Sequence, residues 1–331
     1  MLDERKTSIL RAIVQEYITT GQPVGSTHVA STAGLQVSSA TVRNEMAVLE
    51  QEGYLAQLHT SGGRIPTDKG YRFFVDHLAN PGRLDEIASQ RVGEFFNTAF
   101  GRLEELLHRT TNLLAQVTHQ ASVVVGPSPE RATVRSVQLV GLSERHAVLV
   151  TVLSNGSVEN QPLELSGRIS DTRLAAASAH LAHALVGQTL EQVHVPPTGD
   201  AALDALCDSA AAALRTTTSD EPVFVGGASS MAGAFDAAHT MRSVLRALEE
   251  QYVVVSLVRD MVDRGLAVAI GAEHGVEPLA ACSVIVAPVM VDGEQIGSVG
   301  VLGPTRMNYP QAMATVQTVS SRLARRLGDG S

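Results

Sequence analysis

The chain contains no tryptophan and only two cysteines, and aromatic residues make up 4% of its 331 residues. Cys207 and Cys282 stand far apart, whereas a disulfide framework or a zinc knuckle needs more cysteines at closer spacing. No apolar run reaches the roughly 18 residues of a membrane-spanning helix. The opening segment MLDERKTSIL has mixed charge and lacks the apolar core of a secretory signal. We therefore expect two reduced, buried thiols in a cytoplasmic protein that has no membrane partner.

Positive charge is also scarce in this sequence. Lys and Arg number 25 against 34 Asp and Glu, which gives a formal net charge of −9. Even the first 78 residues hold seven basic and eight acidic side chains. Because phosphate binding depends on Lys and Arg, these counts argue against non-specific coating of nucleic acid. Specific DNA binding would have to rely on local placement of charge and on two copies acting together.

Signatures of catalysis and of cofactor binding are missing as well. The Gly-rich stretch Val225–Ser230 lacks the Lys of a phosphate-binding loop, and its serines lack the nucleophile-elbow pattern. His180 and His183 lie three residues apart, but no third metal ligand accompanies them. We predict that the protein is not an enzyme and that it carries no metal or cofactor.

The hydrophobic pattern, in contrast, is that of a folded α+β protein with several domains. Hydrophobic residues make up 44% of the chain, and its length suffices for two or three domains. Helical spacing, capping residues and Gly or Pro breaks predict helices at 3–19, after Ser26, from Ser38 or Ser39, and at 67–78, 83–119, 170–187, 200–216, 240–250 and 309–327. The segment 83–119 reads as one long helix that Gly93 and Gly101 weaken, and these glycines are candidate positions for a bend or break.

Strand patterns fall into two groups. Alternating or β-branched segments predict strands at 133–142, 146–153, 157–165, 222–225, 266–271, 282–291 and 295–302. Asn155-Gly156 and Asp292-Gly293 are typical of hairpin turns. The sheet near the end of the chain needs a further strand, which Val123–Val125 can supply. Residues 133–218, with the first three strands, would then be an insertion within one domain of the sensor type.

The segment from Val37 to Tyr54, VSSATVRNEMAVLEQEGY, carries the clearest functional signal. Val42, Met46 and Leu49 recur at helical spacing and must face a core, which turns the polar residues between them outward. Arg can pair with guanine and Asn with adenine in the major groove, each good pair discriminating by about 1–3 kcal/mol. We predict that the base-reading residues are Ser39, Thr41, Arg43 and Asn44. The alternative is an ordinary solvated helix face or a protein-interaction module.

A Gly-rich basic turn, HTSGGRIPT, follows this helix and suits a wing that contacts DNA phosphates. Two glycines allow the backbone to approach phosphates closely, and an arginine supplies charge. We predict phosphate contacts from this wing and from polar residues near it: Ser26, Thr27, Ser38, His59, Thr60, Ser61, Gly62, Gly63, Arg64, Lys69 and Arg72. The alternative for the turn is a plain hairpin, and Lys69 and Arg72 could simply be solvated.

Four segments together resemble the heat-inducible transcription repressor family HrcA. They are PVGSTHVA, VSSATVRNEMAVLEQEGYL, HTSGGRIPTDKGYRFFVD and, near the end, IGSVGVLGPTRMNY. The resemblance implies a winged helix-turn-helix domain at 1–80, a GAF-like domain at 83–130 and 220–331, and an inserted dimerisation domain at 133–218. This chain departs from the family at two positions, with Thr27 where a Lys is frequent and Ser39 where a Pro is frequent.

The resemblance also implies a function. Members of the family repress chaperone operons by binding, as homodimers, an inverted-repeat operator in double-stranded DNA called CIRCE. It further implies that the chaperonin GroEL keeps the repressor competent to bind, so that unfolded protein occupying GroEL relieves repression. The main alternative is a ligand-sensing transcription factor whose GAF-like domain binds a small metabolite, and a third is an interaction scaffold without a DNA role. Arg306, within GPTRMNY, either binds an anion or pairs inside the protein.

Overall fold

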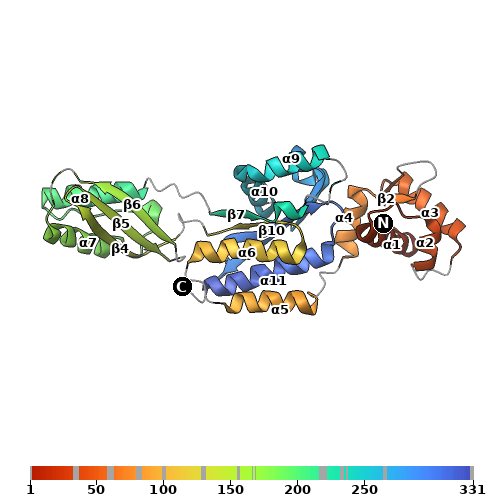
Figure 1. Cartoon of the computed structure of the whole chain (residues 1–331), viewed down its shortest axis with the longest axis horizontal. Coiled ribbons are helices and arrows are strands. Elements are labelled where there is room, and N and C mark those ends of the chain that lie inside the picture. The colour runs from red at the N-terminus through yellow and green to blue at the C-terminus, as the bar shows by residue number, and fades with distance from the viewer. Residues whose placement is uncertain are drawn as a thin grey trace.

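The computed structural model describes residues 2–328 except for 33–36, 58–62, 80–83, 99–101, 128–131, 155–156, 166, 168, 216–221, 232–234, 236–237 and 264–266. The molecule is elongated, with an N-terminal module at one end, a five-stranded sheet in the middle and a three-stranded sheet at the other end (Figure 1). The expectation of an α+β fold with several sheets is confirmed.

The N-terminal module, residues 2–79, consists of short helices and one hairpin. Its elements are α1 (Glu4–Thr20), α2 (Ser26–Thr32), α3 (Ser39–Gln51), β1 (Leu55–Gln57), β2 (Arg64–Pro66) and α4 (Asp68–His77). Asp3, Ser38 and Thr67 begin α1, α3 and α4, each side chain accepting a hydrogen bond from a backbone N–H three residues on. Apolar side chains at helical spacing close the core between α1 and α3. The four helices predicted here are confirmed.

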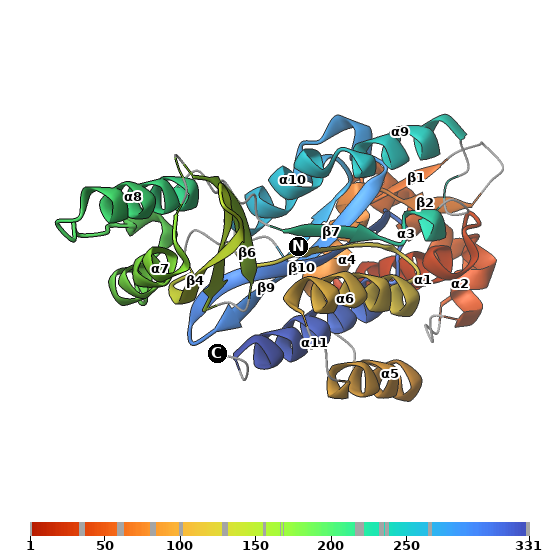
Figure 2. The same ribbon diagram turned by 60° about the vertical axis from the view of Figure 1, so that its left-hand side comes forward.

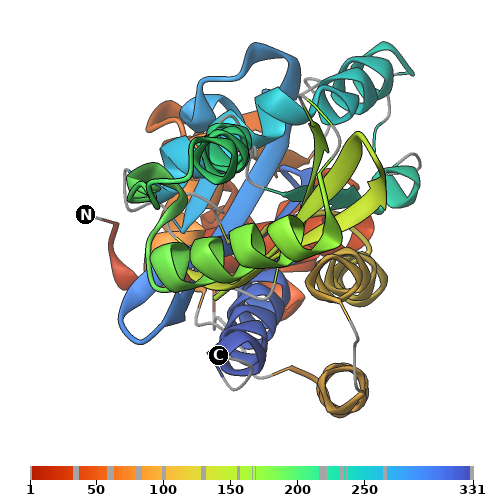
Figure 3. The same cartoon turned by 90° about the vertical axis from the view of Figure 1, so that its left-hand side faces the viewer.

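The segment 83–119, expected as one long helix with a bend or break at Gly93 or Gly101, forms two helices. They are α5 (Glu86–Asn97) and α6 (Leu103–Thr118). Gly93 lies inside α5 without interrupting it, whereas Thr98 adopts an extended backbone that ends the helix. The break lets α5 turn back and pack on the outside of α11 (Tyr309–Gly328), as Figures 2 and 3 show.

The central sheet is antiparallel throughout and follows the order β7-β3-β10-β9-β8. Its strands are β3 (Ala121–Val125), β7 (Val223–Gly226), β8 (Val268–Ile270), β9 (Cys282–Val291) and β10 (Glu294–Pro304). The expectation that Val123–Val125 joins this sheet is confirmed. The predicted turn at Asp292-Gly293 is confirmed too, since both residues have positive φ, at 51° and 86°.

Helices cover both faces of this sheet (Figure 2). α6 and α11 pack on one face, and α9 (Ala238–Glu249) and α10 (Gln251–Asp263) pack on the other. Alternate residues of a strand serve the two layers, so Val124 joins the core under α6 and α11 while Val123 joins the core under α9 and α10. None of the described helices is long and apolar enough to cross a membrane.

The three-stranded sheet belongs to a segment that leaves and re-enters the central sheet at one point. Val125 pairs with Val223, and the Gly126 N–H donates to the Pro222 carbonyl at 2.8 Å. The segment contains β4 (Val134–Ser143), β5 (His146–Leu153), β6 (Val158–Glu164), α7 (Asp171–Leu185) and α8 (Ala201–Arg215). Its apolar side chains form a cluster of their own. The expected order of three antiparallel strands followed by two helices is confirmed.

Candidate DNA-binding surface

Helix α3 lies at the outer end of the N-terminal module, away from the central sheet (Figure 1). Val42 and Leu49 are completely buried and Met46 is nearly so. On the opposite side of the helix Arg43 and Asn44 are exposed. Ser39 and Thr41 are half-buried at the start of the same helix. We call the exposed side that carries Arg43 and Asn44 the reading face.

The beginning of α3 is held by hydroxyl groups. Ser38 Oγ accepts a hydrogen bond from the Thr41 N–H at 3.2 Å and lies 3.0 Å from Thr41 Oγ1. The neighbouring helix α2 packs against α3 and begins at Ser26, which is 8% exposed, while Thr27 is exposed. Thr27 and Ser38 are therefore open to a ligand at this end of the module, and Ser26 is much less so.

The hairpin after α3 is anchored to both α3 and the α1–α2 turn. His59, Thr60, Ser61 and Gly62, predicted as wing residues, lie outside the described residues. Gly63 lies so close to Val24 that an added Cβ would stand 2.5 Å from the Val24 carbonyl carbon and oxygen. Arg64 exchanges two backbone hydrogen bonds with Val24, both of 2.9 Å. Its Nε lies 2.8 Å from Glu50 Oε2, so its charge is paired with α3.

Lys69 reaches the far end of α3 from α4. Its ammonium donates to the Glu52 carbonyl at 2.7 Å and lies 4.4 Å from the centre of the Tyr54 ring. A cation at the C-terminal end of a helix satisfies a carbonyl there and suits the helix dipole. The structure therefore gives Lys69 a capping role at the end of α3 opposite to Ser39 and Thr41.

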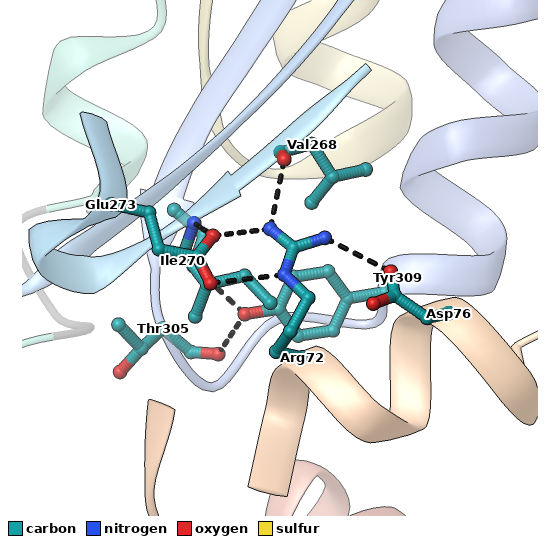
Figure 4. A network of polar contacts seen from close by, with 8 residues as sticks. Arg72, Asp76, Val268, Ile270, Glu273, Thr305 and Tyr309 are labelled. Atoms are coloured by element: carbon teal, nitrogen blue, oxygen red, sulfur yellow. Dashed lines mark hydrogen bonds and ion pairs between the residues drawn. The ribbon is translucent and has the colours of Figure 1, made fainter. Parts of the chain in front are cut away.

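Arg72, predicted as a phosphate contact, faces the central sheet (Figure 4). Its guanidinium grips the Glu273 carboxylate with two nitrogens, Nε to Oε1 at 2.9 Å and Nη2 to Oε2. Nη2 also donates to the Val268 carbonyl at 2.9 Å, and Nη1 to Asp76 Oδ1 at 3.1 Å. Glu273 belongs to the short 3₁₀ helix η4 (Gly271–His274), 201 residues further along the chain.

Electrostatics agree with this geometry. Burial opposes ionisation of Glu273, but the hydrogen bonds from Arg72 and from the Ile270 N–H outweigh it and hold the pKa of Glu273 below its ordinary value. The same ion pair raises the pKa of Arg72. No sequence signal points to Glu273, because only the tertiary fold brings it to α4.

Arg306, a candidate anion site in the sequence, also lies at the border of the module. A Cβ on Gly21 would overlap its guanidinium. Gly21 ends α1 in the left-handed conformation, with φ 65°. Arg306 thus packs against the C-terminal end of α1, where a positive charge is favourable.

Most of the positive charge in the module is therefore engaged within the protein. Arg5 pairs with Glu45 at 3.6 Å and Lys6 with Asp3 at 2.9 Å. The remaining engaged side chains are the three described above: Arg64, Lys69 and Arg72. Over the described residues, Arg11 and Arg43 are the two Lys or Arg side chains of the module with neither an ion pair, a hydrogen bond nor an aromatic contact. Arg43 is the one on the reading face.

Both cysteines of the chain lie outside the N-terminal module. Across the ranges the structure describes, no group of three or more His, Cys, Asp or Glu side chains is placed to hold a metal ion. Cys207 and Cys282 are buried and unpaired, and burial raises the pKa of both thiols, that of Cys282 to about 12.

Comparison with known proteins gives consistent matches along the chain. The family model of the HrcA protein C-terminal domain matches residues 104–313. The heat-inducible transcription repressor HrcA of Kineococcus radiotolerans is 40% identical over 344 residues, with 98% of this chain and 99% of that protein covered. The repressor of the same name from Acidothermus cellulolyticus is 38% identical, with 99% and 100% covered.

A solved structure matches over the same length. It is a crystal structure described only as that of a hypothetical protein, and it aligns with 100% of this chain and 99% of its own. The TM-score is 0.65 and the sequence identity 25%. The overall fold is thus shared with a protein seen in a crystal.

Proposed function

The chain belongs to the HrcA family of heat-inducible transcription repressors, and from that premise we propose how it represses heat-shock transcription: as a homodimer whose two N-terminal modules bind one inverted-repeat operator. Three helices followed by a two-stranded hairpin are the layout of a winged helix-turn-helix. In that motif the third helix lies in the major groove. The observation that carries the proposal is the reading face of α3, where Arg43 and Asn44 stand exposed above a buried row of Val42, Met46 and Leu49.

The contacts to DNA divide between α3 and its surroundings. Ser39, Thr41, Arg43 and Asn44 read base edges. Thr27, Ser38 and the wing His59–Gly63 contact phosphates, which orients the module on the duplex without reading sequence. We leave Arg64, Lys69 and Arg72 out of this set, because each already holds a partner within the protein.

Dimerisation is assigned to the inserted segment, because the outer face of its sheet exposes large apolar side chains beside the polar Gln138 and Asn160. Helices α7 and α8 cover the other face, where Leu139, Leu149 and Leu163 are buried. The outer face shows Val140, Leu142 and Val158, which are 40%, 66% and 53% exposed, on either side of the valines of β5. A face this poor in charge suits a second copy of itself, and a two-fold pair of readers requires a palindromic operator.

The proposed architecture has three domains. Residues 1–80 form the winged helix, 83–130 and 220–331 form a GAF-like domain around the central sheet, and 133–218 form the inserted dimerisation domain. The hydrogen bond between Gly126 and Pro222 supports an insertion at this point. The separate apolar cluster of the inserted segment supports its independence as a folding unit.

The decisive variant is Arg43→Ala. Loss of an Arg contact to a base should weaken binding to the inverted-repeat operator at least tenfold, as expected for a bidentate pair worth about 1–3 kcal/mol. Binding is measured by electrophoretic mobility shift at fixed salt, because affinity for DNA depends on salt. The control is Arg246→Ala, which removes an exposed arginine from α9. Equal operator binding by wild type and Arg43→Ala would count against the assignment.

The chaperonin is the proposed regulatory partner. The family resemblance supports GroEL as the factor that keeps the repressor competent to bind its operator. Footprinting on the promoter of a chaperonin operon, with and without GroEL, tests this. We expect protection of an inverted repeat that strengthens when GroEL is present and weakens when unfolded protein occupies it. A footprint indifferent to GroEL would contradict the partnership.

One cavity favours the ligand-sensing alternative as a second candidate. It has a volume of about 410 Å³ and lies between α10, the β9–β10 hairpin and the root of the insertion, with Val258, Arg259 and Ile296 among its lining residues. Volumes of this size are usual for small-molecule sites. A metabolite that raises the melting temperature in a dose-dependent way, and changes operator affinity, would establish it.

A further inference from the structure

The N-terminal module is joined to the central domain by a set of contacts that we call the junction. Asp68, Tyr71 and Arg72 of α4 form its module side, together with Gly21 at the end of α1. Its central side is η4 and the segment from Thr305 to Tyr309. Arg72 grips Glu273 at one place, and Arg306 packs on Gly21 at another.

Buried groups fill the space between those two charged contacts. The rings of Tyr71 and Tyr309 lie 5.8 Å apart, and both side chains are almost fully buried. Tyr309 is held in turn, because its hydroxyl donates to the Thr305 carbonyl at 2.6 Å and lies 2.8 Å from Ser283 Oγ (Figure 4). Asp68 accepts a hydrogen bond from the Ala272 N–H on η4. The junction is therefore a packed interface with specific polar contacts at its edges.

These contacts do not come from the covalent connection between the two parts. The chain leaves α4 at His77 and continues into α5, whereas Glu273 and Tyr309 arrive from about two hundred residues further on. The angle between the module and the central sheet is consequently set by side-chain contacts rather than by the linker.

We propose that Arg72 and Glu273 are positioning residues that fix this angle, and with it the separation of the two reading faces in the dimer. The proposal rests on the function proposed above, since it concerns how two modules engage one operator. A guanidinium that binds a carboxylate through two parallel hydrogen bonds allows one relative orientation, which a single point charge would not impose. Arg72 also donates a third hydrogen bond to the Val268 carbonyl of β8, which ties the guanidinium directly to the central sheet.

The physical consequence concerns the second binding event. When one module is bound, the other reaches its half-site at an effective concentration that depends on how narrowly its position is defined. Loosening the junction spreads the second module over more orientations. Affinity for the complete operator then falls, while affinity for one half-site does not change.

The test compares Arg72→Ala, Arg72→Lys and Glu273→Gln in the full-length protein, on a complete inverted repeat and on a single half-site. We expect Arg72→Ala and Glu273→Gln each to weaken binding to the complete repeat at least fivefold and to change half-site binding less than twofold. Arg72→Lys should fall between wild type and Arg72→Ala. The combined Arg72→Ala/Glu273→Gln variant should be no weaker than Arg72→Ala alone, because Arg72→Ala already removes the contact with Glu273. Arg246→Ala, which breaks the pair between α9 and Glu250 just after this helix, should match wild type.

A competing role for Arg72 makes a different prediction. If Arg72 contacted a phosphate, Arg72→Ala would weaken half-site and complete operator by the same factor and reduce the salt dependence of both. Glu273→Gln would then leave binding unchanged or improve it. Either that pattern or unchanged binding in both variants overturns the proposal. If the wild-type protein bound neither the complete repeat nor the half-site, the proposed function itself would be refuted.

A measurement without DNA tests the same claim directly. Spin labels on Gln51→Cys in α3 and Arg325→Cys in α11 report the distance between the module and the central domain, because both positions are exposed. The native Cys207 and Cys282 are buried. With labelled chains diluted into unlabelled protein, the distance distribution should be narrow in wild type and broader in Glu273→Gln. Equal widths would overturn the positioning role.

Discussion

At the scale of single residues, most of the few basic side chains of the N-terminal module contact other groups of the protein. Arg64 secures the hairpin root on α3, and Lys69 caps the end of the same helix. Arg72 joins the central domain. Arg43 is left on the reading face, so the contribution of charge to DNA affinity is concentrated at one position of α3. One N-terminal module with a single available arginine on α3 binds DNA weakly. Two modules that bind one operator together restore the affinity.

Gly21 gives a residue-scale test of the junction. Its φ of 65° costs an alanine roughly 1–2 kcal/mol, and the new Cβ would also displace Arg306. We expect Gly21→Ala to lower the free energy of unfolding by about 1.5–3 kcal/mol, since moving the Arg306 guanidinium from the C-terminal end of α1 adds to the backbone strain. Urea denaturation followed by circular dichroism measures this.

Gly275 supplies the matched control for that variant. Its φ is 76°, and a Cβ there would meet open space. Gly275→Ala therefore shows the backbone cost alone. If the two variants lose the same stability, the contact between Arg306 and Gly21 contributes nothing to the junction.

At the scale of elements, Ser38 shows how a helix start and a DNA contact can share one side chain. Ser38→Ala removes the acceptor for the Thr41 N–H and should cost about 0.5–2 kcal/mol of stability. Ser38→Asp keeps an acceptor and should retain stability, yet its negative charge would face the phosphates. We expect normal thermal unfolding but at least tenfold weaker operator binding for Ser38→Asp. Undiminished binding would place Ser38 away from the DNA backbone.

Elements with strong local signals are the ones the sequence predicts correctly. Ser38 as a cap, Gly21 as a stop and Asp292-Gly293 as a hairpin turn each act through neighbouring backbone. For the break after α5 the sequence offers only the weak signal of Gly93 and Gly101, and the end at Thr98 depends on α5 folding back over α11. Helix α10 is not predicted either, because its run of valines favours a strand locally and packing against the sheet decides otherwise.

The same distinction applies to the candidate site. The buried row of Val42, Met46 and Leu49 is a local pattern, and it suffices to predict that Arg43 and Asn44 are exposed. The partners of Lys69 and Arg72 are Glu52 and Glu273, and sequence spacing does not reveal either contact. Whether a basic residue is available to DNA is thus a tertiary property.

At the scale of the whole molecule, the reader and the inserted sheet occupy opposite ends of an elongated body (Figure 1). If the outer face of the inserted sheet joins two chains, the central domain acts as the spacer that holds the readers apart. The spacing of operator half-sites would then depend on the rigidity of this spacer and of the junction. If the central domain or the junction were flexible, the protein would no longer select operators by the spacing of their half-sites.

Excision of the insertion tests this arrangement in one step. Residues 127–221 can be replaced by a short Gly-rich turn, because Gly126 and Pro222 already share a hydrogen bond of 2.8 Å across neighbouring strands. The remaining chain keeps its two apolar clusters and should unfold cooperatively. We expect it to sediment as a monomer, to bind a half-site as the intact protein does, and to lose at least tenfold in affinity for the inverted repeat. A shortened chain that still sediments as a dimer would place the contact between subunits on the central domain instead.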